Sequence, residues 1–307
     1  MPKADLIRTI TRTPVGAPGS GPYAVVVDPQ DATWTTLVHS GQVARLPAAG
    51  PVEIHDLGNP ACRPSQVTMG PDGALWVTRN GDDRIDRIAA DGTRRSVAAD
   101  GTRRSVAVPG GAGPYGLTTG PDGALWFTAL GAGAIGRLDL DGNVSMTVLP
   151  GGGAPAMITA GPDGALWFTL NRSGALGRID VDRDITLHRL PDPACGPVGI
   201  TADTAAIWFV EIDAGRVGRM SPAGDLQEFD LPDRSARPHA ITSDRAGGCW
   251  VTLWSGHSAA RITERGEIAE LHTFHDGDEP HGIAMAADGS VLVALESGDI
   301  ARLHPGR

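Results

Sequence analysis

The nine residues GPDGALWVT at 70–78 recur almost unchanged as GPDGALWFT at 120–128 and at 161–169. Four weaker copies share the pattern and are DPQDATWTT (28–36), DTAAIWFV (203–210), DRAGGCWVT (244–252) and AADGSVLVA (286–294). Self-similarity at a fixed period is the signature of a repeat architecture, in which each repeat is one supersecondary unit. The sequence therefore predicts seven structural repeats.

The spacing of the repeats is measured on one anchor residue per copy: Trp34, Trp76, Trp126, Trp167, Trp208, Trp250 and Leu292. Successive anchors are 42, 50, 41, 41, 42 and 42 residues apart. The long gap arises because ADGTRRSVA at 90–98 is repeated letter for letter at 99–107, and removing nine residues reduces 50 to 41. We interpret this as a tandem duplication that lengthens one outer strand or its loop and has no chemistry of its own.

Each repeat contains four short runs of alternating apolar and small residues, separated by Asp-Gly or Ser-Gly. Asp-Gly between such runs predicts a two-residue hairpin turn with positive φ at both residues. Four strands in 40–45 residues form one propeller blade, so we expect an all-β, seven-bladed β-propeller with four-stranded antiparallel blades. The last repeat lacks an outer strand, and LIRTITRTP (6–14) is patterned like one, so the N-terminal strand is expected to close the last blade. Residues 1–307 are thus predicted to form a single domain.

Composition argues against several classes of function. The 307 residues carry a formal net charge of −10 without a basic cluster, which argues against nucleic-acid binding. Three scattered cysteines argue against a disulfide framework or a zinc site. No apolar run is long enough to span a membrane, and the first residues do not resemble a signal peptide, so we expect a cytoplasmic location. A closed propeller needs no partner subunit, so we expect a monomer.

A proline stands 11 or 12 residues before each anchor and is expected to open the strand that lines the central channel. The residues that follow these prolines should surround one mouth of the channel: Tyr23, Ser65, Tyr115, Ala156, Val198, His239 and His281. A lone histidine at such a boundary is usually an ordinary surface residue, but here two neighbouring blades carry one each. We therefore predict one site around His239 and His281. The other seven histidines (39, 55, 188, 257, 272, 275 and 304) hold no repeated position and are expected to have no role in it.

Two glutamates are expected beside His281. If Asp288-Gly289 is a two-residue loop, paired residues have numbers that sum to 577, which places Glu296 opposite His281. Glu279 precedes His281 by two residues at the same mouth. Carboxylates suit Mg²⁺, and a histidine can take a proton from a carbon next to a carbonyl group. The residues alone leave open that both glutamates are ordinary rim carboxylates.

The chain resembles the virginiamycin B lyase (streptogramin B lyase) family. The resemblance rests on GPDGALWFT with the following GAIGRL (133–138), and more specifically on RPHAI (237–241), EPHGI (279–283) and ALES (294–297). It covers essentially all seven blades. Leu292 departs from the pattern, because it stands where the tryptophan anchor recurs elsewhere and could shift the neighbouring Glu296.

The resemblance implies a Mg²⁺-dependent carbon–oxygen lyase that confers antibiotic resistance. Such an enzyme opens cyclic depsipeptide streptogramin B antibiotics by elimination at the ester bond and not by hydrolysis. By position in the motifs, His281 corresponds to the general base, Glu279 and Glu296 to the Mg²⁺ ligands, and His239 to a substrate-binding residue. Tyr23 and Tyr115, on the same ring of positions, are expected to contact the substrate too.

Two other functions remain open at this point. A propeller lactonase or esterase would also use a metal, but normally with more protein ligands, and Glu211 is the one further candidate in a comparable place. A propeller without catalytic activity could bind a peptide or carbohydrate ligand at the same mouth. The mass of the product separates these possibilities, because elimination preserves the mass and hydrolysis adds one water.

Overall fold

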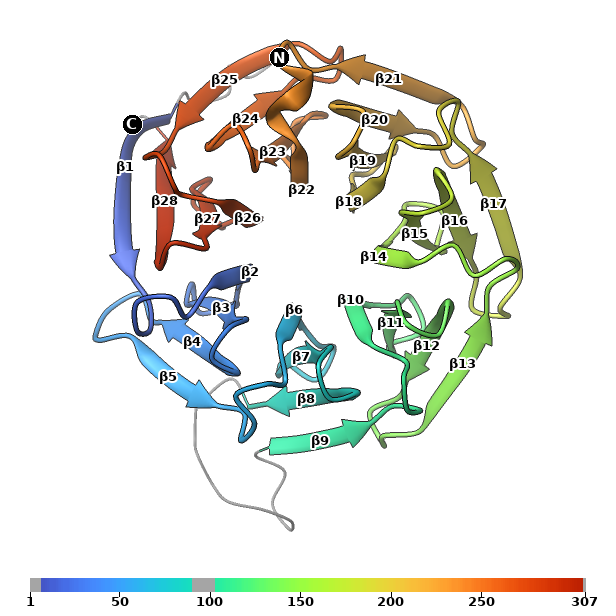
Figure 1. Cartoon of the computed structure of the whole chain (residues 1–307), viewed down its shortest axis with the longest axis horizontal. Coiled ribbons are helices and arrows are strands. Elements are labelled where there is room, and N and C mark those ends of the chain that lie inside the picture. Colours follow the sequence, from blue (N-terminus) through green and yellow to red (C-terminus); the bar gives the residue numbers. More distant parts are fainter. Residues whose placement is uncertain (1–6, 90–102, 306–307) are drawn as a thin grey trace.

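Seven four-stranded antiparallel sheets surround a central channel in the computed structural model, which describes residues 7–89 and 103–305 (Figure 1). We number these blades 1–7 in the order of their inner strands. Each inner strand begins at one of the seven repeated prolines, as expected. The seven-bladed β-propeller with antiparallel blades is therefore confirmed.

The strands run from the channel outwards in each blade. Blade 1 consists of β2 (Pro22–Val27), β3 (Thr33–Leu37), β4 (Gln42–Leu46) and β5 (Glu53–Asp56). Blade 2 consists of β6 (Pro64–Met69), β7 (Leu75–Arg79), β8 (Arg84–Ile88) and β9 (Arg103–Ala107). Blade 3 consists of β10 (Pro114–Thr119), β11 (Leu125–Ala129), β12 (Ala134–Leu138) and β13 (Val144–Val148). Blade 4 consists of β14 (Pro155–Ala160), β15 (Leu166–Leu170), β16 (Ala175–Ile179) and β17 (Ile185–Arg189).

The remaining three blades follow the same plan. Blade 5 consists of β18 (Pro197–Ala202), β19 (Ile207–Glu211), β20 (Arg216–Met220) and β21 (Leu226–Asp230). A short 3₁₀ helix, η1 (Arg234–Ala236), leads into blade 6, which consists of β22 (Pro238–Ser243), β23 (Cys249–Leu253), β24 (Ser258–Ile262) and β25 (Ile268–Thr273). Blade 7 consists of β26 (Pro280–Met285), β27 (Val291–Leu295), β28 (Asp299–Pro305) and, as its outer strand, β1 (Ile7–Pro14). In the described part of the chain, no helix is long and apolar enough to cross a membrane.

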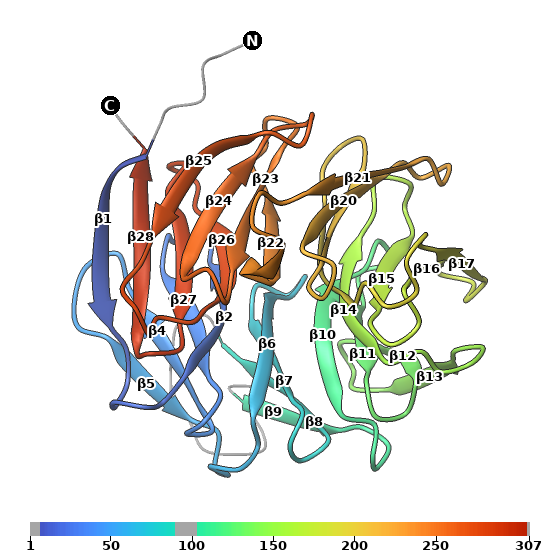
Figure 2. The ribbon, with the colours of Figure 1, turned by 45° about the horizontal axis from the view of Figure 1, so that its top comes forward.

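The N-terminal strand closes the ring, as predicted. β1 lies beside β28 in an antiparallel pair, with Ile10 opposite Leu303 and Pro14 opposite Asp299 (Figure 2). The pairing supplies the fourth strand of blade 7 and covers the edge that β28 would otherwise expose.

The GPDGALW motif is a structural unit, which blade 3 illustrates. The Asp122 carboxylate accepts hydrogen bonds from Trp126 Nε1 at 2.9 Å and from Arg137 Nε at 2.6 Å. The turn differs from the expected one. Gly120 N–H bonds to Ala124 O, and positive φ occurs at Gly123 but not at Asp122, so the loop has three residues with the glycine in the left-handed conformation.

The same three-residue loop corrects the register of blade 7. Ala286 N–H bonds to Ser290 O, and Ala284 pairs with Leu292, so paired residues sum to 576 and not to the expected 577. A bulge between Pro280 and Ile283 shifts the pairing again at the mouth. Leu292 takes the place of the tryptophan anchor without displacing β27, because it is buried and stays in register with its neighbours.

The described part of the duplicated segment forms the outer strand of blade 2. Residues 103–107, from the second copy, form β9 and pair with β8, while the first copy at 90–98 lies outside the described residues. β9 has five residues, as do the outer strands β13, β17 and β21, so the outer strand is not lengthened. In the sequence, the extra residues therefore fall between β8 and β9.

Candidate functional site

A threonine two residues after most anchors fixes the backbone at the channel mouth. In blade 6, Thr252 Oγ1 accepts a hydrogen bond from Ala240 N–H at 2.9 Å and donates one to His281 O at 2.8 Å. Thr128 makes the same two bonds between blades 3 and 4. Each of these threonines connects the bulge of its own inner strand to the next blade, so Thr252 sets His239 and His281 relative to each other.

Blades 7 and 1 approach closely at the mouth because of Gly282. A Cβ atom at this position would lie 2.5 Å from Tyr23 O, which is too close for any side chain. The approach brings the Tyr23 ring to 4.6 Å from the His281 ring, measured between centroids. The two blades that meet where the chain closes thus contribute adjacent side chains to one site.

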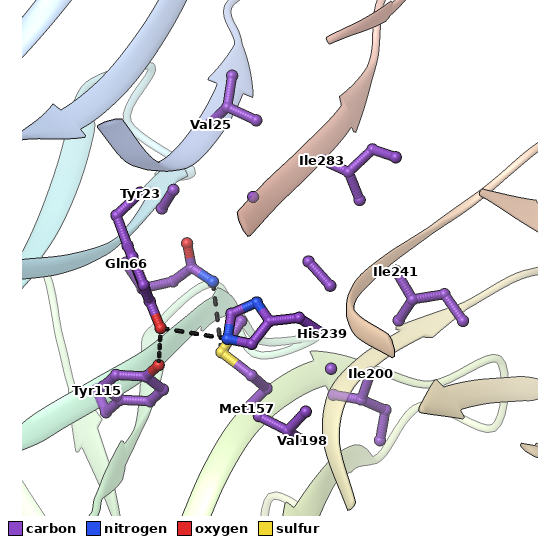
Figure 3. A pocket seen from close by; sticks show the side chains of 14 residues that line it. Tyr23, Val25, Gln66, Tyr115, Met157, Val198, Ile200, His239, Ile241 and Ile283 are labelled. Atoms are coloured by element: carbon purple, nitrogen blue, oxygen red, sulfur yellow. Dashed lines mark hydrogen bonds between the residues drawn. The ribbon is translucent and has the colours of Figure 1, made fainter. Parts of the chain in front are cut away.

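A small cavity of about 80 Å³ lies in the channel below this mouth (Figure 3). Its lining includes Tyr23, Gln66, Tyr115, Met157 and His239. The cavity has room for a few water molecules but not for a cyclic peptide. A large ligand would therefore have to lie over the mouth.

The two tyrosines and His239 form a chain of hydrogen bonds across the channel. Tyr23 Oη lies 2.6 Å from Tyr115 Oη and 3.4 Å from His239 Nε2 (Figure 3). Burial raises the pKa of both tyrosines, so both are protonated at neutral pH. Burial and the neighbouring His281 lower the pKa of His239 to about 3, so its imidazole is neutral and can donate one hydrogen bond.

Glu279, His281 and Glu296 form the second part of the site. One ligand atom from each of the three side chains lies within 4.8 Å of those of the other two. His281 is buried, and its Nε2 contacts Glu296 Oε2, whereas the two glutamates are partly exposed. The hydrogen bond from His281, together with one from His39, outweighs burial and lowers the pKa of Glu296 to about 2.

The expected contact between His281 and Glu296 is present, although the pairing that predicted it was wrong. The backbone partner of Glu296 is Glu279, whose carbonyl accepts a hydrogen bond from Glu296 N–H at 3.0 Å. The corrected register therefore places the two carboxylates side by side at the ends of their strands, and the side chain of Glu296 reaches His281.

The donor set fits a hard divalent cation. Two carboxylates and an imidazole lie together, and neither glutamate forms an ion pair with an arginine or lysine among the described residues. Two close carboxylates repel each other, and a cation bound between them removes this repulsion. Mg²⁺ typically uses one or two protein carboxylates and keeps its other ligands as water or substrate.

A network behind the site holds the loops of both glutamates. Asp278, next to Glu279, accepts hydrogen bonds from Arg12 of β1 at 2.8 and 2.9 Å. It also accepts one from Ser297 Oγ, next to Glu296, at 2.6 Å. The strand that closes the propeller is therefore tied directly to both carboxylate-bearing loops.

Sequence reasoning missed one residue of the site, His39 of blade 1. Its Nε2 lies 2.6 Å from Glu296 Oε1, although the histidine was expected to have no role. It stands five residues after Trp34, and a comparison of this position across the blades would have singled it out. Three other histidines pack on tryptophan anchors: His55, His188 and His272.

Glu211, the further ligand considered for a lactonase, does not belong to the cluster. It is fully buried, and burial and neighbouring Glu228 raise its pKa to about 8. Its nearest basic group is Arg216, at 3.7 Å. Among the described residues, Glu279 and Glu296 are therefore the only carboxylates of the ligand cluster at the mouth.

Known structures resemble this chain over nearly its whole length. Virginiamycin B lyase from Staphylococcus aureus, in selenomethionine-substituted form, is 33% identical, with a TM-score of 0.89 over 96% of this chain and 98% of that chain. A catalytically inactive His-to-Ala variant of the enzyme from the same species, solved with quinupristin, is 32% identical, with a TM-score of 0.89. It also covers 96% of this chain and 98% of that one.

Sequence comparisons agree. The virginiamycin B lyase of Mycolicibacterium smegmatis is 45% identical over 51 residues, a match that spans only 17% of each protein. The model of the virginiamycin B lyase family, by contrast, matches residues 8–303. The chain belongs to the virginiamycin B lyase family.

Proposed function

We propose that the protein is a Mg²⁺-dependent carbon–oxygen lyase that linearises streptogramin B antibiotics by elimination and thereby confers resistance. The cluster of Glu279, His281 and Glu296 next to His239 carries the proposal, because it combines a cation site with a base. Membership of the virginiamycin B lyase family and the likeness to a relative solved with quinupristin support this substrate class.

Each side chain has a defined task in this proposal. Glu279 and Glu296 would hold Mg²⁺, which when bound draws electron density from a substrate carbonyl and makes the adjacent C–H group more acidic. His281 takes that proton with the ring nitrogen that carries no hydrogen, while its other nitrogen contacts Glu296. His239, neutral and 4.8 Å from His281 between ring centroids, donates a hydrogen bond to a substrate oxygen.

The reaction balances without water. His281 removes the α-proton of the threonine residue that bears the ester, and the electron pair left on carbon forms a double bond. The carbon–oxygen bond to the ester breaks, and the carboxylate leaves with its electrons. The products are a linear peptide with a dehydrated residue and a proton that passes from His281 to solvent.

The substrate would lie over the mouth, because the cavity below it is small. Tyr23 and Tyr115 form the boundary between the mouth and this cavity and would contact the face of the bound peptide. A monomer in the cytoplasm remains our expectation from the sequence.

Product mass tests the proposal directly. Quinupristin is incubated with the protein and Mg²⁺, with and without EDTA, and the product is analysed by mass spectrometry. We expect a ring-opened isomer of unchanged mass, formed only when Mg²⁺ is present. A product heavier by one water would indicate hydrolysis. If no product formed under any condition, both enzyme functions would be excluded for this substrate, and a ligand-binding propeller without catalytic activity would remain.

His281→Ala tests the base. We expect turnover to fall to background while the circular dichroism spectrum remains that of the wild type. Turnover at the wild-type rate would refute the assignment of His281.

A further inference from the structure

Glu296 is held on both of its oxygens by residues of two different blades. His281 of blade 7 contacts Oε2, and His39, which follows β3 of blade 1, lies with Nε2 2.6 Å from Oε1. We propose that His39 is a positioning residue that orients the Glu296 carboxylate for cation binding. This inference rests on the proposed function in one respect, namely that Glu296 binds the cation.

The chemistry of the contact defines what His39 does. An ionised carboxylate has no proton to donate, so the imidazole donates from Nε2–H to Oε1. A glutamate held on one oxygen can still turn about its last side-chain bond, whereas a second hydrogen bond fixes the plane of the carboxylate. Hydrogen bonds that orient ligating side chains typically change metal affinity 10–100-fold.

The loop around His39 is shaped to hold the imidazole in place. His39 N–H bonds to Ser20 O at 3.0 Å, and Val38 N–H bonds to Gly21 O at 2.9 Å. Gly21 has a φ of +69°, and a Cβ atom there would lie 2.4 Å from His39 Cδ2. The ring thus packs against a backbone position that only glycine can occupy without moving it.

Comparison of the blades shows that this imidazole is not part of the common framework. The position five residues after each anchor is occupied in blades 2–7 by Gly81, Gly131, Arg172, Asp213, Ser255 and Ser297. Blade 1 alone has a histidine there, and blade 1 adjoins blade 7, which carries Glu296 (Figure 1). The side chain is 53% exposed, so core packing does not account for it.

Direct measurement of cation affinity tests the role without relying on activity. Mn²⁺ is titrated into the purified protein, and the free ion is followed by electron paramagnetic resonance. We expect His39→Ala to raise the Kd about 10-fold, at the low end of the usual range because the bond is exposed to solvent. His39→Gln retains an N–H donor at similar reach and should remain close to the wild type.

His304→Ala is the matched control. His304 is another solvent-accessible histidine, and its Nε2 lies 2.9 Å from Thr11 Oγ1 on the outer strands of blade 7. This variant should leave the Mn²⁺ affinity unchanged. With quinupristin, His39→Ala should need more Mg²⁺ but reach the wild-type kcat at saturation, a separation that a general loss of structure would not produce.

Three outcomes would overturn the inference. Unchanged Mn²⁺ affinity in His39→Ala would show that the contact does not orient Glu296. Equal weakening in His39→Gln would show that the hydrogen bond is not the cause. A wild-type protein that binds no Mn²⁺ would remove the cation from the proposed function as well, so the wild-type titration distinguishes the two failures.

Discussion

Arg12 of the closing strand should contribute substantially to stability. Its guanidinium bonds to both oxygens of Asp278, whose side chain is only 4% exposed, and to Asp299 at 2.8 Å. Arg12→Ala would leave the Asp278 carboxylate with the Ser297 hydroxyl and the His275 N–H as its remaining partners. Breaking a buried pair by removing one partner costs 3–5 kcal/mol. Because the Arg12 side chain is 27% exposed, water can enter the gap, and we expect a loss of about 3 kcal/mol.

The pH dependence of this loss follows from Asp278. Burial alone would raise the pKa of this carboxyl, but the hydrogen bonds from Arg12, Ser297 and His275 N–H lower it below its ordinary value. A carboxyl whose pKa is lower in the folded state stabilises the fold above its unfolded pKa, about 3.9, and loses this contribution as the pH falls through the folded value. The difference between Arg12→Ala and the wild type should therefore be largest near pH 7 and should shrink below about pH 4.

Urea unfolding at pH 7 and at pH 3.5, followed by tryptophan fluorescence, measures both effects. Arg302→Ala is the control, because Arg302 pairs with the exposed Asp288 on the same blade at 3.0 Å and should cost less than about 1 kcal/mol. The reasoning would be refuted if Arg12→Ala lowered the free energy of unfolding no more than the control does. It would also be refuted if the decrease were the same at both pH values.

Three further perturbations have defined outcomes. Thr252→Val should lower the free energy of unfolding by about 1–3 kcal/mol and should also reduce turnover. The equivalent Thr169→Val in blade 4 should lower the free energy of unfolding by a similar amount but leave turnover unchanged. Gly282→Ala should lower both Tm and turnover, because its Cβ would push Tyr23 away from the site; wild-type values for both would contradict this. Burial and His281 lower the pKa of His239 to about 3 in the folded state. Between about pH 6.5 and 3 the unfolded chain therefore binds one more proton than the folded chain, and the free energy of unfolding decreases as the pH falls. His239→Gln should remove part of this decrease in the free energy of unfolding, up to about 1.4 kcal/mol per pH unit. Urea unfolding with the same pH dependence as the wild type would exclude this role of His239.

The placement of His239 and His281 at one mouth was predictable because the repeat is nearly regular. The anchors and prolines recur at fixed spacing, so each inner strand begins where the sequence predicts, and His239 and His281 fall at equivalent positions. The pattern of the N-terminal segment likewise predicted its pairing with the last blade. Local periodicity suffices for these features, since each blade repeats one arrangement.

The register of blade 7 was not predictable from the Asp-Gly pair. Asp-Gly occurs in loops of both two and three residues, and the extra residue changes every pairing by one. The hydrogen bond from Thr252 to His281 O then stabilises a bulge that shifts the pairing again before Glu296. The two shifts still leave Glu296 within reach of His281, because its side chain is long.

By itself the sequence determined the seven blades, their closure and the residues around the channel mouth, because these features follow from a repeat with one local geometry. Only the tertiary structure decided which side chains meet across blade boundaries. His39 and Glu296 are 257 residues apart, and Arg12 and Asp278 are 266 apart, so no local pattern links them. They become neighbours because closing the ring brings blade 1 and the N-terminal strand against blade 7, where Glu279, His281 and Glu296 lie.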